Sequence, residues 1–423
     1  MKKAIITFLI LTLAIFAGNN GIQADYETEL TIAVGEVGAE YETVVAAAEQ
    51  YMAENPEIYI EVIDSPAESG ERLSYFLTHF ERESSEVDIY QIDVIWPGIL
   101  EEHLVDLYDY GAEEHLEGHF DFIIENNTTP EGELIAMPWF IDAGMLYYRA
   151  DLLEKYELDV PETWSELEEK ARIIMEGERE NNPDFEGFVW QGAPYEGLTT
   201  NVLEWFASND GGNFVSKDRE VTVLNDNNLY MLEKVIGWMG DITPLAVTGF
   251  IEEDSRAVWH EGNAAFMRNW PYAYGMTEES EAIEDFGVTR IPAGPEGESA
   301  SALGGWHLGV SQYSESPEEA AEFAFFLASA EIQKMRAIQA SLPPTIEELY
   351  GDEEILAENP LFEEFLHIFE TAVPRPSAQT APYYEAASEA IFSGIHLALT
   401  GERDALTALE NLEIELEEIL QWE

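Results

Sequence analysis

The sequence contains no cysteine, and this absence removes several classes of protein at once. Without cysteine there is no disulfide framework, no thiol catalyst and no residue that acylation could use to hold the protein on a membrane. Phosphate-binding loops and dinucleotide-binding glycine fingerprints do not occur in the 423 residues either. We therefore expect neither a bound cofactor nor a lipid anchor.

Basic residues are scarce, with 19 Lys and Arg against 86 Asp and Glu, and the formal net charge is −67. Such a charge excludes nucleic acid as a partner. The hydrophobic fraction of 46 % is ordinary, so the charge indicates a globular protein with an acidic surface and not a disordered chain. Molar salt screens the resulting self-repulsion, which predicts a halophilic protein. The acids are dispersed and form no calcium-loop motif, which favours solvation over calcium binding.

Long hydrophobic runs are missing beyond the N-terminus. Lys2 and Lys3 precede an apolar run over residues 4–17, and a segment of small and polar residues follows up to Ala24. This order is typical of an export signal, so we expect residues 1–24 to be removed. No later segment approaches the roughly 20 apolar residues that a membrane span needs. The sequence predicts a protein that is free in the periplasm.

The first part of the remaining chain alternates between strand and helix patterns. Strands are expected over 30–34, 58–62 and 87–95, and helices over 43–53 and 71–83. This order predicts a parallel, doubly wound sheet, in which ligands lie beyond the carboxyl ends of the strands. Glu40, in the loop after the first strand, Arg72, after the second, and Asp93, near the end of the third, should therefore lie along one edge.

The rest of the chain is also a mixture of strands and helices. Residues 133–149 form two expected strands separated at Pro138, a connection that should pass from one lobe to another. Helices are expected over 161–178, 201–209, 317–329 and 330–339, and strands over 185–190 and 304–311. The amphipathic last segment, 404–420, favours a terminal helix that covers its own domain over a coiled-coil partner helix.

Three segments carry large rings without the periodicity of a helix or a strand: 188–198, 266–276 and 303–309. In each of them the rings are mixed with Gly, Pro, Asn or Gln. Rings on irregular backbone beside amide groups suit a ligand with apolar faces and polar edges. Sugars are such ligands. Ordinary loop packing is the alternative for any one segment, and the three together favour a binding cleft.

Several motifs along the chain resemble those of a known family: YQIDVIWPG, WFIDAGMLYYRADLLEKY, YEGL, GNAAFMRNWPYAYGM, LGGWHLGVSQYS and AVPRP. In this order they resemble the extracytoplasmic solute-binding proteins of ABC sugar importers, in particular the trehalose/maltose-binding branch. The resemblance covers nearly the whole chain after the signal. It implies the bilobal, maltose-binding-protein-like fold of type II, in which two α/β lobes are joined by a hinge with multiple crossovers. The expected lobes are 25–138 with about 292–345, and 139–291 with about 346–423.

The resemblance also implies which residues contact the sugar: Glu40, Arg72, Asp93, Phe140, Asp142, Trp270, Tyr272, Gly305, Trp306 and Arg375. The register around Glu40 could shift onto Glu36. Phe140 stands where relatives can have Tyr, a change that removes one hydrogen bond to the ligand. Trp270, Tyr272 and Trp306 are expected to stack on the sugar, whereas Trp190 and Tyr195 are expected to support the second lobe.

These residue types suit a sugar, because carboxylates accept hydrogen bonds from hydroxyl groups and an arginine donates to them. We expect a monomeric substrate-binding subunit that delivers a glucose-containing disaccharide to a permease, with trehalose favoured and maltose or sucrose as alternatives. Other hypotheses are a binding protein for a compatible solute such as glucosylglycerol, and a secreted glycoside hydrolase that uses Asp93 and Asp142. The resemblance, and arginine beside the carboxylates, favour binding over catalysis.

Two histidine motifs were also considered. His115 and His119 have the spacing of a zinc site, but Leu116 stands where a zinc protease carries its glutamate, so we expect no metal. His307 has two interpretations, as a ligand contact beside Trp306 or as a packed strand residue.

Overall fold

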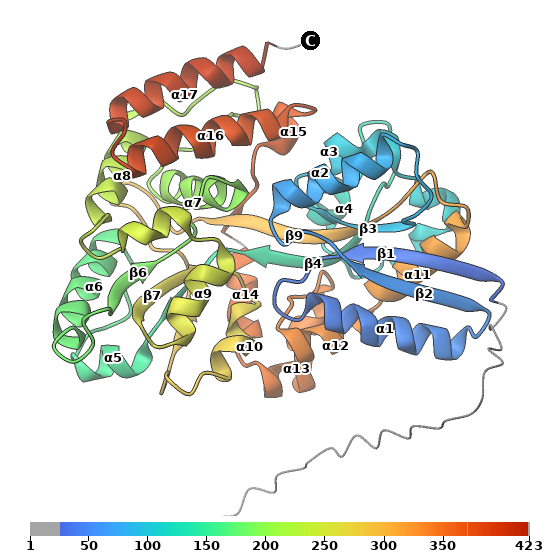
Figure 1. Cartoon of the computed structure of the whole chain (residues 1–423), viewed down its shortest axis with the longest axis horizontal. Coiled ribbons are helices and arrows are strands. Elements are labelled where there is room, and N and C mark those ends of the chain that lie inside the picture. The colour runs from blue at the N-terminus through green and yellow to red at the C-terminus, as the bar shows by residue number, and fades with distance from the viewer. Residues whose placement is uncertain (1–25, 370, 422–423) are drawn as a thin grey trace, which may run out of the picture.

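The computed structural model describes residues 26–369 and 371–421, so the expected export signal lies outside the described residues. The chain forms two lobes, and each lobe is built on its own β-sheet. The two lobes lie side by side in Figure 1. We call the part around the six-stranded sheet the first lobe and the part around the four-stranded sheet the second lobe.

The first sheet contains β1 (Thr28–Val34), β2 (Ile58–Asp64), β3 (Ile89–Asp93), β4 (Met137–Ala143), β9 (Ser301–Val310) and β10 (Ala372–Val373). β1 is parallel to both β2 and β3, which confirms the expected order of the first strands. The long β9 lies antiparallel to β3 on one side and to β4 on the other. The sheet is therefore mixed beyond its first three strands.

Two helices connect these parallel strands, and both begin earlier than expected. α1 (Glu40–Glu54) begins at Glu40 and not near 43, because acidic residues stabilise the first turn of a helix. Glu40 is thus a helix residue and not a loop residue. α2 (Ser69–Phe80) is capped by Glu68, whose carboxylate accepts hydrogen bonds from the backbone N–H groups of Gly70 and Glu71, at 2.9 and 2.8 Å. This cap sets the start of α2 beside the end of β2.

The chain crosses from the first lobe to the second at Gly144, between β4 and β5 (Met145–Tyr148). The expected break at Pro138 is wrong: Pro138 lies within β4, where the pairing with β9 shifts register, a position that tolerates the missing N–H group. Gly144 is required by close packing, since a Cβ atom there would lie 1.8 Å from a carboxylate oxygen of Glu204. The predicted passage between lobes is confirmed.

The second sheet has the order β6-β7-β5-β8, with β6 (Glu186–Val189), β7 (Ala264–Asn269) and β8 (Gly287–Thr289). Its helices are α5 (Ala150–Lys155), α6 (Trp164–Glu178), α7 (Glu196–Ala207), α8 (Asp226–Trp238), α9 (Glu252–His260) and α10 (Ala273–Glu278). α7 is buried along most of its length and begins at Glu196, five residues before the expected start. α7 therefore brings Glu196 to the boundary between the lobes.

The C-terminal helices α16 (Tyr384–Leu399) and α17 (Ala405–Ile419) lie over α7 and α8 at the top of Figure 1. Leu409, Leu412 and Leu416 of α17 are buried in the core of the second lobe. The expectation that the last helix covers its own domain is confirmed.

Further helices surround the first sheet and the crossover strands. They are α3 (Pro97–Leu100), α4 (Asp121–Asn126), α11 (Pro317–Ala328), α12 (Ala330–Ala340), α13 (Glu353–Glu358), α14 (Phe362–Phe369) and α15 (Ser377–Thr380). Short 3₁₀ helices lie at Glu101–His103, Leu107–Tyr110, Ala112–His115, Leu245–Gly249 and Glu347–Gly351. α13 contacts α12, and α14 contacts β4 and β9. The predicted residue limits of the lobes stay a prediction.

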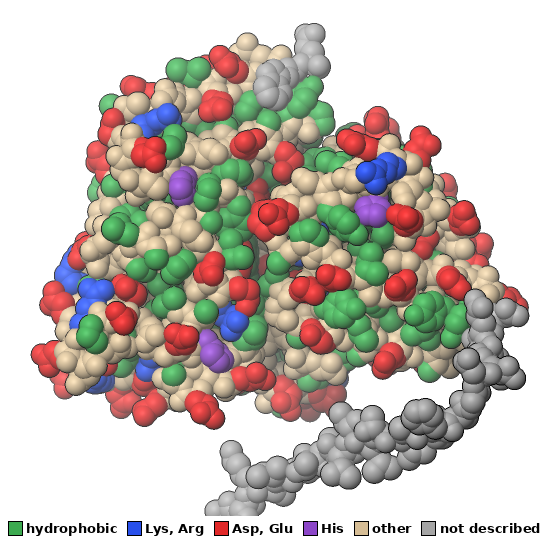
Figure 2. All heavy atoms as spheres, viewed as in Figure 1, with side chains coloured by type: hydrophobic (Ala, Val, Ile, Leu, Met, Phe, Trp, Pro, Cys, Tyr) green, Lys and Arg blue, Asp and Glu red, His purple; other side chains and the backbone are tan. Residues whose placement is uncertain are grey.

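Acidic side chains are spread over both lobes on the face shown in Figure 2, with few basic ones between them. None of the helices within 26–369 and 371–421 is long and apolar enough to cross a membrane. The expected adaptation to high salt stays a prediction.

Candidate functional site

A cavity lies between the two lobes, with about 640 Å³ of empty space when the part open to solvent is included. Its walls are formed by Val37, Glu40, Ala67, Ser69, Asp93, Asp142, Tyr195, Glu196, Gly197, Thr200, Glu252, Trp270, Tyr272, Gly304, Gly305, Trp306 and Arg375. Carboxylates, rings and one guanidinium group therefore face a common space.

Most of the residues expected to contact the ligand line this cavity: Glu40, Asp93, Asp142, Trp270, Tyr272, Gly305, Trp306 and Arg375. Arg72 and Phe140 do not line it. Glu36 is exposed and lies outside the cavity wall, whereas Glu40 is buried and lies within it. The first turn of α1 therefore brings Glu40, and not Glu36, to the cavity wall.

Arg72 and Phe140 lie behind the wall. Arg72 is fully buried, its Nε donates to the carbonyl oxygen of Pro66 at 2.8 Å, and its guanidinium group lies 4.2 Å from the ring centroid of Trp306. Strand order predicts that Arg72 lies near the site, but it does not give the direction of the side chain, which turns beneath Trp306. Phe140 is also buried, beside the guanidinium group of Arg336.

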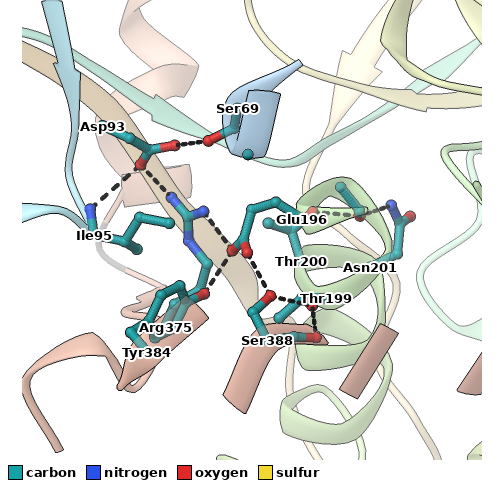
Figure 3. A network of polar contacts seen from close by, with 12 residues as sticks. Ser69, Asp93, Ile95, Glu196, Thr199, Thr200, Asn201, Arg375, Tyr384 and Ser388 are labelled. Carbon is teal, nitrogen blue, oxygen red and sulfur yellow. Dashed lines mark hydrogen bonds and ion pairs between the residues drawn. The ribbon is translucent and has the colours of Figure 1, made fainter. Parts of the chain in front are cut away.

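Arg375 connects the two lobes at the floor of the cavity (Figure 3). Its Nη2 donates to Asp93 Oδ1 at 2.8 Å, and its Nη1 donates to Glu196 Oε1 at 2.7 Å. Asp93 ends β3 of the first lobe and Glu196 begins α7 of the second. Arg375 itself follows β10, a strand of the first sheet, on the path to the C-terminal helices. Burial lowers the pKa of Arg375, but the two carboxylates outweigh burial and raise it.

Further donors complete the contacts of these carboxylates. Glu196 also accepts from the hydroxyl groups of Tyr384 and Ser388 on α16, and Asp93 accepts from Ser69 Oγ at 3.2 Å. Nε of Arg375 has no hydrogen-bond partner among the described residues, although it is buried. The two terminal nitrogens of the guanidinium group therefore make its contacts to the carboxylates.

Asp142 differs from the other carboxylates of the cavity. It lies on β4 close to the crossover and is 8 % exposed, and its Oδ1 finds no partner in the part of the chain that the structure describes. Burial raises the pKa of Asp142 to about 8, and the charges of Glu40 and Asp93 add to this effect. At neutral pH the group is mostly protonated, so it can either donate or accept a hydrogen bond.

Two tryptophan rings of the cavity are each backed by a buried arginine. The guanidinium group of Arg268 lies 4.0 Å from the ring centroid of Trp270, as that of Arg72 does at 4.2 Å for Trp306. Arg268 is fixed in turn by two bonds to the carboxylate of Glu204, at 2.9 and 2.6 Å. Arginine side chains stack well on indole faces. One face of each indole ring is therefore covered by a guanidinium group, which fixes the orientation of the ring.

The start of α9 fixes the edges of the rings. Glu252 accepts from the hydroxyl group of Tyr195 at 2.7 Å and from Nε1 of Trp270 at 3.3 Å, and Glu253 accepts from the hydroxyl group of Tyr272 at 2.7 Å. Tyr195 was expected only to support the second lobe, but it lines the cavity. Trp190 is fully buried against Trp205, as expected for a supporting residue.

Sequence reasoning missed Ser69, Glu196, Thr200 and Glu252 as cavity residues. Glu196 stood within the YEGL motif, which was a usable signal. Glu252 is one of many dispersed acids, and nothing in its sequence context distinguishes it.

The histidines lie elsewhere. The ring of His115 stacks on Phe325, and Nδ1 of His119 lies 2.7 Å from the hydroxyl oxygen of Thr345. His307 is buried in β9 outside the cavity wall, and burial lowers its pKa to about 3. Of its two interpretations, the structure supports packing.

Comparison with known proteins agrees with this architecture. A family model described as bacterial extracellular solute-binding protein matches residues 35–334. A protein of Deinococcus radiodurans named probable ABC transporter-binding protein is 42 % identical over 422 residues, which cover 99 % of either chain.

Solved structures give the same result. Maltose-bound MalE3 of T. maritima has a TM-score of 0.87 and 35 % identity, over 92 % of this chain and 99 % of its own. The GacH receptor of Streptomyces glaucescens, solved unliganded and with acarbose, has a TM-score of 0.83 and 24 % identity, over 93 % and 98 %. The predicted bilobal, maltose-binding-protein-like fold is confirmed.

Proposed function

Because the chain belongs to the family of bacterial extracellular solute-binding proteins, we propose that it is the sugar-binding subunit of an ABC importer. One observation carries the proposal: the cavity between the lobes combines two arginine-backed indole rings with carboxylates and a guanidinium group. The rings suit the C–H faces of a pyranose, and the charged groups suit its hydroxyl groups.

We propose a glucose-containing disaccharide as the ligand, with trehalose favoured and maltose or sucrose as alternatives. The similarity to a maltose-bound protein at 35 % identity supports this class of ligand, as does a cavity lined by rings and carboxylates of both lobes. The proposed contacts are Glu40, Asp93, Asp142, Trp270, Tyr272, Gly305, Trp306 and Arg375, with Glu196 and Glu252 added from the geometry. Arg72 and Phe140 are proposed to act from behind the wall.

The proposal also includes the location of the protein and its partner. We propose a monomer that is exported to the periplasm and hands its ligand to permease subunits in the membrane. The excess of acidic residues supports work at high salt.

A glycoside hydrolase is the second candidate, and one observation favours it. The raised pKa of Asp142 is a property of general acids in such enzymes. The other carboxylate, Asp93, is engaged by Arg375, by Ser69 and by the backbone N–H group of Ile95, which leaves it little freedom to act as a nucleophile or base. We therefore propose binding without hydrolysis.

Titration calorimetry of the mature chain at high salt against trehalose, maltose, sucrose and glucosylglycerol tests the proposal. We expect saturable one-to-one binding of at least one disaccharide, and no release of glucose during a long incubation. Absence of binding by all four compounds would show that the proposed ligand class is wrong. Steady glucose release would support the hydrolase instead.

Replacing Gly38 by alanine is expected to weaken sugar binding about tenfold, or ~1.4 kcal/mol. Gly38 has a φ of +62°, and a Cβ atom there would lie 2.8 Å from Cδ2 of Tyr272 on the other lobe. The added methyl group would therefore push the lobes apart.

Gly111→Ala is the matched control, because Gly111 also has a positive φ, of +90°, but a Cβ atom there meets nothing within 4 Å. Calorimetry on both variants should show weaker binding only for Gly38→Ala. Equal dissociation constants for the two would mean that the contact between Gly38 and Tyr272 does not limit closure.

A further inference from the structure

The carboxylates of the cavity are only partly balanced by arginine. Asp93 and Glu196 share the guanidinium group of Arg375, and this arginine is the one basic side chain that lines the cavity among the described residues. Within the part of the chain that the structure describes, the side chain of Glu252 is hydrogen-bonded to uncharged groups, the hydroxyl of Tyr195 and Nε1 of the indole of Trp270. The wall of the cavity therefore carries more negative than positive charge.

Asp142 is a carboxylate of the cavity wall that no arginine contacts among the residues that the structure describes. It is more than nine-tenths buried, it lines the cavity, and its Oδ1 is without a hydrogen-bond partner within the described residues. Glu40 from α1 and Asp93 from β3 act on it more strongly than Arg336 from α12 and Arg268 from β7. The potential at Asp142 is negative even before its own charge is counted.

The other titratable groups near Asp142 do not change this balance. Tyr147 of β5 and Tyr350, close to α13, are fully buried, and burial together with the charge of Asp142 raises the pKa of both phenols well above 10. They are uncharged at any physiological pH. In the empty cavity a proton occupies Asp142 at neutral pH, since burial and the two carboxylates raise its pKa to about 8.

We propose that the cavity selects its ligands by charge: it accepts uncharged sugars, binds most tightly a sugar that presents a protonated amine to Asp142, and rejects sugars that carry a phosphate or a carboxylate. This inference rests on the proposed function as a sugar-binding protein. An amine cation takes the place of the proton on Asp142 and is stabilised by three carboxylates, Glu40, Asp93 and Asp142. A phosphate in the same cavity meets those carboxylates, and Arg375, its nearest cation, is already paired.

The proton balance of this exchange is simple. Below pH 8 the protonated amine enters, Asp142 loses its proton to the buffer, and the complex holds an ammonium–carboxylate pair. Affinity for the amine should therefore rise with pH between about 6 and 8, by up to about tenfold per unit. An uncharged sugar can bond to either form of Asp142, so its affinity should change less than about threefold over the same range.

The test uses the whole mature chain and whichever of trehalose, maltose or sucrose binds it. Calorimetry compares that disaccharide with its monoamino analogues, in which an amine replaces the hydroxyl at C2, C3, C4 or C6, and with its 6-phosphate. At pH 7 we expect at least one amine to bind about tenfold more tightly or better, with proton release that shows as different heats in phosphate and Tris buffers. The phosphate should bind at least about a hundredfold more weakly.

Two variants separate the local effect from the overall acidity of the chain. Asp142→Asn should remove the preference for the amine over the parent sugar, while Glu385→Gln should keep it. Glu385 lies outside this cavity, in an adjoining pocket, so it offers the same change in net charge without the contact. The preference should also persist in 1 M salt, because salt screens buried pairs much less than surface charges.

Each result has one meaning. If the parent disaccharide binds but no amine analogue binds more tightly and no proton is released, the charge selection is wrong and the sugar-binding function stands. If none of trehalose, maltose and sucrose binds, the proposed function as a disaccharide-binding protein is wrong. The buffer experiment uses the unaltered protein, so the inference can be overturned even where Asp142→Asn fails to fold.

Discussion

Replacing Arg268 by methionine is expected to lower the free energy of unfolding by about 3 to 5 kcal/mol. Arg268 and Glu204 are each 1 % exposed, and two hydrogen bonds of 2.9 and 2.6 Å join them. Methionine leaves the carboxylate of Glu204 buried without a cation. The loss is large because Glu204 also accepts from the backbone N–H group of Ala302, at 3.1 Å, and so connects α7 to the long crossover strand β9.

Urea unfolding of the mature chain measures this loss. Arg179→Met is the control: Arg179 also pairs with a glutamate, Glu186, at 2.9 Å, but its side chain is 37 % exposed, and the cost should stay below about 1 kcal/mol. The double variant Arg268→Met, Glu204→Leu should recover part of the stability, because it removes both buried charges. Equal stability of Arg268→Met and the unaltered chain would show that the pair is not needed.

Replacing Trp270 by alanine is expected to weaken disaccharide binding by about 2 to 4 kcal/mol, which is roughly 30- to 1,000-fold. Trp270 lines the cavity, one face of its indole lies on Arg268, and its Nε1 is held by Glu252. The remaining face is positioned to cover a pyranose. Alanine removes that surface and leaves open space in its place.

Calorimetry of the sugar that binds the unaltered chain gives the measurement. Trp270→Tyr should retain much of the affinity, because a phenol still presents an aromatic face. Trp190→Phe is the control in the same lobe: Trp190 is buried against Trp205 outside the cavity, and affinity should stay within about threefold. An unchanged dissociation constant for Trp270→Ala would exclude stacking on this ring.

The two predictions are connected through the same side chain. Arg268 supports the back of Trp270 as well as neutralising Glu204, so the methionine variant should also bind sugar more weakly than its stability alone explains. The weaker sugar binding can be measured by calorimetry on the fraction of Arg268→Met that stays folded.

Topology alone predicted part of the site. Because β1, β2 and β3 are parallel, their carboxyl ends meet at one edge, and Glu40 and Asp93 lie there as expected. The same argument placed Arg72 at this edge but could not give the direction of its side chain, which depends on how the first turn of α2 packs under Trp306. Glu40 and Asp93 were therefore predictable from strand order, whereas Glu196, Glu252 and the arginines behind the rings were not.

The missed residues have local physical reasons. The expected helix over 201–209 begins earlier, at Glu196, and the ring of Tyr195 packs directly on Gly197, where a Cβ atom would lie 2.2 Å from the ring. The break assigned to Pro138 belongs to Gly144 for a similar reason, the close approach of Glu204. The contact of Gly144 with Glu204 joins residues far apart in the sequence, and the packing of Tyr195 on Gly197 has no periodic pattern. The sequence therefore predicts neither contact.

A crystal structure of the mature chain with the disaccharide that binds most tightly would show where the sugar lies. We expect the sugar between the lobes, with pyranose faces against Trp270 and Trp306 and a hydroxyl group within hydrogen-bond distance of Asp142. A sugar bound outside this cavity, or one inside it that touches neither ring, would show that the cavity is not the proposed binding site.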